Sequence, residues 1–234
     1  MPDRSDHMGS WTVTCCEHDD AVARHAAQHV VRAAHQAIAD HGVFNFAVSG
    51  GRTPWVMFEH LAHMDMPWES TRIFQVDERI APADDPARNL LHLRQALSGA
   101  PAEVHPMPVE DPDPQEGARR YAAELPDRFD LIHLGLGPDG HTASLVPDDA
   151  ILQVRDRKVA ITEQAYQGHR RMSLTYPVLD SALNLMWLVT GAEKQSALSA
   201  LLAHDQSIPA GRVDGPDNLV VCDEAARSGA VDSA

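Results

Sequence analysis

The apolar positions of this chain follow two spacings, which predict buried strands and amphipathic helices. The runs 43–48, 129–134 and 185–189 are almost continuously apolar and too short for helices, so they predict strands buried on both faces. Over residues 19–40 the apolar positions recur at steps of four and three, which predicts one long helix with a single apolar stripe. The positions of that stripe are Val22, Ala26, Val30, Ala33 and Ala37.

The same reading along the whole chain gives strands and helices in alternation. Strands are expected at 11–15, 43–48, 72–76, 129–134, 159–162, 171–175, 185–189 and 219–222, and a short strand or extended segment at 104–109. Helices are expected at 19–40, 54–63, 86–97, 116–124 and 192–203. Asp19 or Asp20 would cap the first helix, and Gly42 would end it. This order predicts an α/β fold with a Rossmann-like open, mostly parallel sheet and helices on both faces.

Length, charge and cysteine content narrow the functional classes. The 234 residues suit a single domain, expected over 10–226 with flexible ends at 1–9 and 227–234. A net charge of -15 argues against nucleic-acid and anionic-membrane partners, and no apolar stretch approaches a membrane span. The three cysteines form no disulfide framework, which favours a cytoplasmic protein. A monomer or weak homodimer is expected.

A glycine-rich turn, Ser49-Gly50-Gly51-Arg52-Thr53-Pro54, joins a predicted strand to a predicted helix. Glycines let the backbone approach a ligand, and a helix N-terminus offers free N–H groups and a positive dipole end to an anion such as phosphate. An ordinary tight turn between strand and helix explains the same residues equally well. The segment matches neither a P-loop nor a dinucleotide fingerprint, so no nucleotide is indicated.

Two more segments follow predicted strands and carry titratable groups. Asp77-Glu78-Arg79 is either a solvated strand end with a local ion pair or a part of the same crevice as the glycine turn. Leu134-Gly135-Leu136-Gly137-Pro138-Asp139-Gly140-His141-Thr142 holds a histidine among glycines. Ligands of open α/β sheets bind outside the carboxyl ends of the strands. Imidazole has an ordinary pKa of about 6.5, so His141 is a candidate general base, although it could be a structural histidine.

The remaining candidates are cations. Arg171 opens a predicted strand, and Lys194 lies in the first turn of a predicted helix, where a cation opposes the dipole and so favours an anionic partner. Each of them alone is more often a solvated surface charge. The scattered histidines show no metal-ligand spacing, and the serine-hydrolase elbow is absent.

Together these segments resemble the 6-phosphogluconolactonase family, which shares its fold with glucosamine-6-phosphate deaminases and ribose-5-phosphate isomerases. The likeness covers about residues 45–200 and is carried by 49–54, 77–79, 134–147, 171–175 and 191–194.

The resemblance implies hydrolysis of 6-phospho-D-glucono-1,5-lactone to 6-phospho-D-gluconate, the second step of the pentose phosphate pathway, without metal or organic cofactor. It assigns catalysis to His141 as the base that activates water, and to Asp77. It assigns substrate binding to Ser49, Gly50, Gly51, Thr53, Arg79, Asp139, Arg171 and Lys194. Of these, the glycine turn, Thr53, Arg171 and Lys194 would hold the phosphate, and Asp139 could orient the imidazole.

Four positions bear on how closely the chain follows the family. Arg52 stands where the family commonly has a small hydroxyl residue, and Arg88 replaces a frequent serine. The closest alternative is a deaminase or isomerase on the same fold. Deaminases typically carry a glutamate where this chain has Val146 and a tyrosine where it has Arg79, so both positions favour the lactonase. A non-catalytic sugar-phosphate sensor is the alternative from another class.

Overall fold

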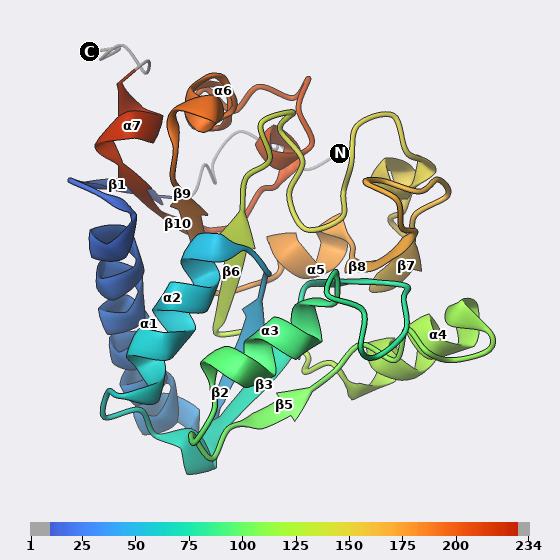
Figure 1. The fold of residues 1–234 in the computed structure, drawn as a ribbon, viewed down its shortest axis with the longest axis horizontal. Coiled ribbons are helices and arrows are strands. Elements are labelled where there is room, and N and C mark those ends of the chain that lie inside the picture. The colour runs from blue at the N-terminus through green and yellow to red at the C-terminus, as the bar shows by residue number, and fades with distance from the viewer. Residues whose placement is uncertain (1–9, 229–234) are drawn as a thin grey trace, which may run out of the picture.

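The computed structural model describes residues 10–228, which form a parallel sheet beside a small antiparallel one (Figure 1). The large sheet has seven strands in the order β1-β10-β9-β6-β2-β3-β5, and all its pairs are parallel. Its strands are β1 (Ser10–Cys16), β2 (Phe44–Val48), β3 (Thr71–Gln75), β5 (Glu103–His105), β6 (Leu131–Gly135), β9 (Leu185–Val189) and β10 (Asp217–Asp223). The predicted fold class is thereby confirmed.

The small sheet contains β4 (Asp77–Arg79), β8 (Arg171–Leu174) and β7 (Val159–Ile161), with antiparallel pairing throughout. Val76 joins the two sheets, because its N–H donates to Val48 of β2 while its carbonyl accepts from Leu174 of β8. The sequence predicts β7 and β8 as strands but not their separate sheet. The charged segment 77–79 itself becomes a strand of it.

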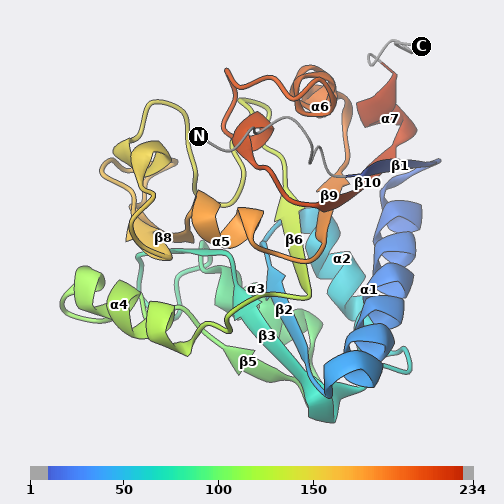
Figure 2. The ribbon, with the colours of Figure 1, turned by 180° about the vertical axis from the view of Figure 1, so that it is seen from behind.

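Helices cover both faces of the large sheet (Figure 2). The helices are α1 (Asp19–His41), α2 (Arg52–Ala62), α3 (Asn89–Ala96), α4 (Pro114–Glu124), α5 (Tyr176–Asp180), α6 (Gln195–Leu202) and α7 (Glu224–Arg227). Short 3-10 turns are η1 (Trp68–Ser70), η2 (Ala150–Gln153), η3 (Ala192–Lys194) and η4 (Ala210–Arg212). No helix of the described residues is long and apolar enough to cross a bilayer.

Strand β9 shows how one apolar run serves two cores. Its five residues are all buried. Leu185, Trp187 and Val189 pack with α5, α6 and α7, whereas Met186 and Leu188 pack with α1, α2 and α3. Successive side chains of a strand point to opposite faces, so a strand covered on both sides needs apolar residues at every position.

Several predicted boundaries are wrong for local reasons. The N-cap of α1 is His18, whose ring accepts from the N–H of Ala21, rather than Asp19 or Asp20. Helix α3 begins at Asn89 instead of Pro86, since the carboxylate of Glu78 accepts from the N–H groups of Asn89 and Leu90. Of the short strand or extended segment predicted at 104–109, residues 104 and 105 belong to β5. The helix predicted at 192–203 divides into η3 and α6. Helices α5 and α7 were not predicted, because five and four residues are too short to show a helical periodicity.

The ends of the predicted domain lie close to the limits of the described residues. Arg227 belongs to α7, so the folded part extends past the predicted boundary at residue 226. The predicted flexible segment 1–9 and the last six residues of the predicted tail, 229–234, lie outside the described residues.

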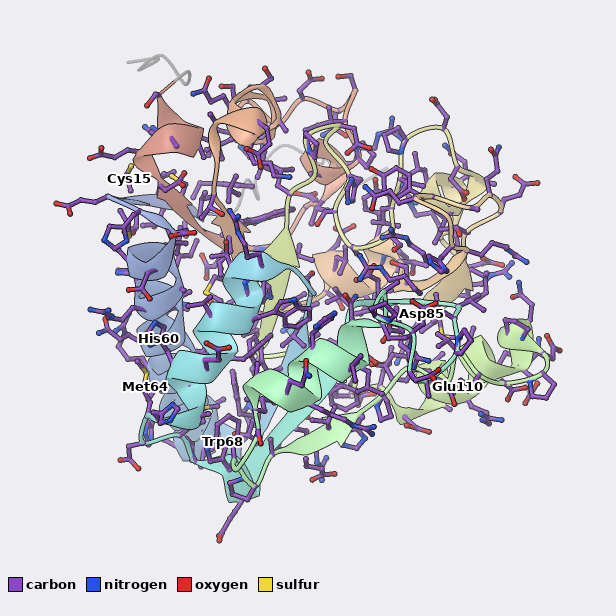
Figure 3. All side chains as sticks on the ribbon, viewed as in Figure 1. Cys15, His60, Met64, Trp68, Asp85 and Glu110 are labelled. Atoms are coloured by element: carbon purple, nitrogen blue, oxygen red, sulfur yellow. The ribbon has the colours of Figure 1, made fainter. Side chains whose placement is uncertain are left out.

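The direction of the strands places the functional segments. The turn after β2, the loop after β6 and the segment η3–α6 after β9 all lie at the carboxyl ends of parallel strands, on the upper side of the molecule in Figure 1. Trp68 of η1, just before β3, lies near the bottom of the molecule in Figure 3 and marks the opposite, amino-terminal end of the sheet.

Candidate active site

A cleft of about 480 Å³ opens at the carboxyl edge of the large sheet. It lies between the glycine turn, β4, the loop after β6, and η3. All predicted site residues but one line it: Ser49, Gly50, Gly51, Thr53, Asp77, Arg79, His141, Arg171 and Lys194. Asp139 stands behind His141 instead. The topology therefore brings together residues that are far apart in the sequence.

His141 is held by two neighbours. Its Nδ1 lies 2.6 Å from Oδ1 of Asp139, and the hydroxyl of Tyr166 donates to Oδ2 of the same carboxylate at 2.9 Å. An ionised carboxylate only accepts, so this pairing assigns the proton of the neutral imidazole to Nδ1. Nε2 is then the atom with a lone pair available for a proton.

Burial and hydrogen bonding fix the protonation states of the two supporting groups. Burial by itself would raise the pKa of Asp139, but the hydrogen bond and charge of His141, together with the Tyr166 hydroxyl, lower it below its ordinary value. Burial first, and the bond to Asp139 second, raise the pKa of Tyr166 to about 12. Tyr166 therefore remains a donor, and Asp139 an acceptor, at neutral pH.

The loop after β6 can take this shape only because it contains glycine. A Cβ on Gly137 would collide with the ring of His141 and with the carboxylate of Asp139. Gly140 has a φ of 80°, in the left-handed region, and a side chain there would also strike Ile208. The loop closes on itself through the Gly137 N–H, which donates to the carbonyl of His141 at 2.8 Å.

The glycine turn leaves the N-terminus of α2 uncapped by any described side chain. The hydroxyl of Ser49 donates to the carbonyl of His133, and its N–H donates to Nδ1 of the same residue at 3.3 Å. The hydroxyl of Thr53 pairs with that of Thr190 at 2.7 Å. Free N–H groups and a helix dipole make this end of the cleft suited to an anion.

His133 lies directly behind this turn and is fully buried on β6. Burial lowers the pKa of His133 to about 3, so the ring is neutral at physiological pH and can accept from Ser49. Its Nε2 has no hydrogen-bond partner among the described residues.

Two arginines from the small sheet also line the cleft. Nη1 of Arg171 lies 3.8 Å from Oδ2 of Asp77, and Ser144 donates to the same oxygen at 2.6 Å. Arg79 donates to the carbonyl of Ala87 and to the side-chain oxygen of Asn89. Burial lowers the pKa of Arg171, while Asp77 opposes the shift. Guanidinium nevertheless stays charged in proteins.

Glu78 and Arg88 support this part of the cleft from behind. Both are almost completely buried, with Nε of Arg88 lying 3.3 Å from Oε2 of Glu78. Arg88 also reaches Glu110 at 2.8 Å. This arginine, which replaces a frequent serine of the family, therefore pairs with buried and surface carboxylates outside the cleft.

The charge of the cleft is positive in spite of the acidic chain. Its wall carries the cations Arg52, Arg79, Arg171 and Lys194 against the carboxylates Asp77 and Glu193. The Arg52 side chain is 82 % exposed, and its Nη2 lies as far as 4.0 Å from Oδ2 of Asp19. Such an exposed, long ion pair holds the charge of Arg52 weakly. No group of three or more metal-ligating side chains occurs within residues 10–228.

Sequence reasoning missed three residues of this site. Tyr166 lies in an irregular loop, Asn89 begins α3, and Thr190 directly follows β9. Asn89 fills the space beside Gly50, where a Cβ would collide with its amide. Only Thr190 had a usable signal, since it follows the carboxyl end of β9.

Comparison with known proteins places this arrangement in a family. The family described as "Glucosamine-6-phosphate isomerases/6-phosphogluconolactonase" matches residues 17–221. The chain belongs to this family. A 6-phosphogluconolactonase of Synechocystis sp. is 37% identical over 202 residues, covering 79% of this chain and 83% of the relative. One of Thermotoga maritima is 32% identical, covering 74% of this chain and 80% of the relative.

Solved structures of the family share the fold. The crystal structure of the Thermotoga maritima 6-phosphogluconolactonase superposes with a TM-score of 0.83 at 26% identity, covering 92% of this chain and 100% of that one. A monomeric glucosamine-6-phosphate deaminase reaches a TM-score of 0.78 at 18% identity, over 93% of this chain and 99% of that one. The second likeness shows the common fold alone.

Proposed function

We propose that this chain hydrolyses 6-phospho-D-glucono-1,5-lactone to 6-phospho-D-gluconate, the second step of the oxidative pentose phosphate pathway. The relatives named 6-phosphogluconolactonase support the reaction. The observation that carries the proposal is the pairing of His141 with Asp139 in the same cleft as an uncapped helix N-terminus and several cations. One end can hold a proton acceptor and the other a phosphate.

His141 would act as general base through Nε2. A water between Nε2 and the lactone carbonyl loses its proton to the imidazole while its oxygen attacks the carbonyl carbon. The tetrahedral intermediate then collapses, the bond from the carbonyl carbon to the ring oxygen breaks, and the imidazolium returns the proton to that oxygen. Asp139 stabilises the imidazolium and fixes the ring orientation. General base catalysis contributes roughly 10²–10⁴-fold.

The phosphate would anchor the remote end of the substrate. The N-terminus of α2, Thr53, Arg171 and Lys194 line one part of the cleft and offer donors or positive charge to it. Anchoring at this distance reduces the entropic part of the barrier by holding the carbonyl near His141.

The roles of Asp77 and Ser49 remain predictions. Asp77 accepts from Ser144 and faces Arg171, contacts that favour a role in positioning Arg171 over direct participation in catalysis. Ser49 lines the cleft, but its hydroxyl and N–H already donate to His133. A cytoplasmic location, a monomeric or weakly dimeric state and the absence of a cofactor likewise remain predictions.

The proposal is tested by following lactone loss by NMR, with the lactone generated in situ from glucose 6-phosphate. Wild type should accelerate the loss above the spontaneous rate, and His141→Ala should be at least tenfold slower. Acceleration by both proteins alike would remove His141 from the mechanism, and acceleration by neither would reject the reaction.

The same assay can be run with glucosamine 6-phosphate, the substrate class of the related deaminases. Val146 is 4% exposed, and an apolar side chain there offers no carboxylate for a proton relay. We therefore expect no deamination. Release of ammonia from glucosamine 6-phosphate would reverse the choice between the two activities.

A further inference from the structure

A second cleft, the side pocket, adjoins the first one on the far side of the two arginines. It measures about 290 Å³ and shares half of its ten lining residues with the main cleft, namely Gly51, Arg79, Asn89, Gln167 and Arg171. Trp55 of α2 and His92 of α3 line the side pocket and not the main cleft, as does His169 from the loop before β8. The side pocket therefore offers its own contacts to a ligand held by the shared arginines.

The composition of the side pocket selects for negative charge. Two arginines and two histidines line it, and none of its lining residues is acidic. By contrast, carboxylates line the main cleft (Asp77) and three further surface clefts, which contain Glu110, Asp217 and Asp148. In a chain with 34 acidic and 19 basic residues, a pocket without a carboxylate is a local positive region that attracts anions.

The shared arginines have binding capacity left over. Arg171 is 3% exposed, and its Nε has no hydrogen-bond partner among the described residues. Nη2 of Arg171 donates to neutral oxygens of Tyr166 and Gln167, and Arg79 likewise donates to neutral oxygens. Asp77 is the carboxylate that faces Arg171. Asp77 and the Tyr166 ring, whose centroid lies 5.0 Å from Cζ of Arg171, compensate part of this buried charge, and a bound anion would add to that compensation.

His92 adds a donor that depends on protonation. Its Nε2 lies 2.8 Å from the carbonyl of Pro86, so in the neutral ring Nε2 carries the proton and Nδ1 is free. A protonated ring would present Nδ1–H as well. The indole of Trp55 lies against this imidazole, with ring centroids 5.6 Å apart, and limits its movement.

We propose that the side pocket is a second binding site for a phosphate-type oxyanion, either inorganic phosphate or the phosphate group of a sugar phosphate. It differs from the phosphate position at the N-terminus of α2, Arg171 and Lys194 in its contacts with Trp55, His92 and His169. Because Arg79 and Arg171 line both clefts, an anion in the side pocket weakens the hold of the main cleft on its substrate. Binding itself does not depend on the proposed lactonase function, whereas the inhibition rests on it.

Calorimetric titration with inorganic phosphate tests the binding. We expect two equivalents in the wild type and one in the double variant H92L/H169L, whose substitutions lie outside the main cleft. In K194M, which weakens the main-cleft position, the side-pocket equivalent should persist. A single equivalent in wild type, or two equivalents in H92L/H169L with unchanged affinities, would overturn the proposal.

A parallel titration with glucose 6-phosphate separates the two sources of the anion. A second equivalent for both ligands identifies the phosphate group as the feature recognised, and a second equivalent for inorganic phosphate alone restricts the pocket to the free ion. If H92L/H169L does not fold, H169L replaces it, because no hydrogen bond of the His169 ring is seen within residues 10–228 and its loss disturbs little. H169L should then weaken the second equivalent at least threefold, and unchanged binding would overturn the proposal.

The kinetic arm measures inhibition of lactone hydrolysis by inorganic phosphate. H92L/H169L should keep the wild-type kcat in phosphate-free buffer and show at least a fivefold higher inhibition constant. Equal inhibition constants would contradict the coupling between the clefts. If the chain proved to have no lactonase activity, the calorimetric result would still decide whether the site exists.

Discussion

The two ends of the main cleft differ in how far their polar groups are already hydrogen-bonded within the protein. At the histidine end, Asp139, His141 and Tyr166 are hydrogen-bonded to one another, and Asp139 stays an acceptor while Tyr166 stays a donor. At the cation end, Arg171 keeps an unpartnered Nε, and α2 begins without a side-chain cap. The first end is complete without a ligand, whereas the second is electrostatically incomplete.

This difference separates orientation from binding. A general base must already be in position when the water arrives, so its hydrogen bonds are made within the protein. A phosphate-binding surface must leave donors unused, because each internal partner would compete with the ligand. Changes at the histidine end should therefore act on kcat, and changes at the cation end on KM.

The largest effect is expected from His141→Gln, which keeps a side-chain N–H for Asp139 but removes the proton acceptor. We expect kcat to fall by about 10²–10⁴-fold with little change in KM. Progress curves from NMR at saturating lactone measure this directly. A variant with less than a threefold loss in kcat would show that the base lies elsewhere.

The second-largest effect is expected from Arg171→Leu, which should act on KM rather than on kcat. Loss of a charge-assisted contact worth about 1.5–3 kcal/mol raises KM by roughly 10–100-fold. Arg171→Lys keeps the charge without the planar fork, so it should recover only part of the affinity. Thermal unfolding of both variants controls for the buried carboxylate of Asp77, which loses its cation in Arg171→Leu. An unchanged KM in Arg171→Leu would break the comparison.

A smaller effect is expected from Tyr166→Phe, which keeps the ring and removes the donor to Asp139. The loss of one hydrogen bond to a charged group should lower kcat about tenfold. Asp139 has a lowered pKa and Tyr166 one of about 12, so neither titrates near neutrality. The ratio of the kcat of wild type to the kcat of Tyr166→Phe should thus stay constant between about pH 5 and 9. A ratio that varies with pH would give Tyr166 a proton-transfer role.

The smallest kinetic effect concerns His133, which supports the glycine turn from behind. His133→Leu removes the acceptor for the Ser49 N–H and should raise KM by about 2–5-fold without changing kcat. His133→Asn places an amide oxygen near the position of Nδ1 and should restore KM. Equal KM values in wild type and both variants would show that His133 only packs in the core and does not support the glycine turn.

His133 also predicts a pH dependence of stability. Its folded pKa of about 3 lies below the ordinary value of about 6.5, so below pH 6.5 the unfolded chain binds a proton that the folded chain does not. The stability contributed by neutral His133 is fully present above about pH 6.5. Below it, the free energy of unfolding falls by up to about 1.4 kcal/mol per pH unit down to the folded pKa. Urea unfolding at pH 7 and pH 5 should show a smaller loss in His133→Asn than in wild type, and equal losses would contradict the burial argument.

The comparison also explains what the sequence could reveal. Apolar runs predicted the large sheet because buried parallel strands are apolar at every position, as in β9. The residues after those strands, such as Thr53 and His141, could be placed at one edge from topology alone. Tyr166 could not, since an irregular loop has no periodicity. Likewise the sequence assigns no role to Arg88, whose ion pair with the buried Glu78 is visible only in the structure.

The most direct test measures kcat and KM for lactone hydrolysis in wild type, His141→Gln and Arg171→Lys in one experiment. The account predicts that His141→Gln loses kcat at constant KM, while Arg171→Lys raises KM and largely keeps kcat. If both variants instead showed the same pattern of change in kcat and in KM, the two ends of the cleft would not have separate roles. The assignment of base and phosphate anchor would then be wrong.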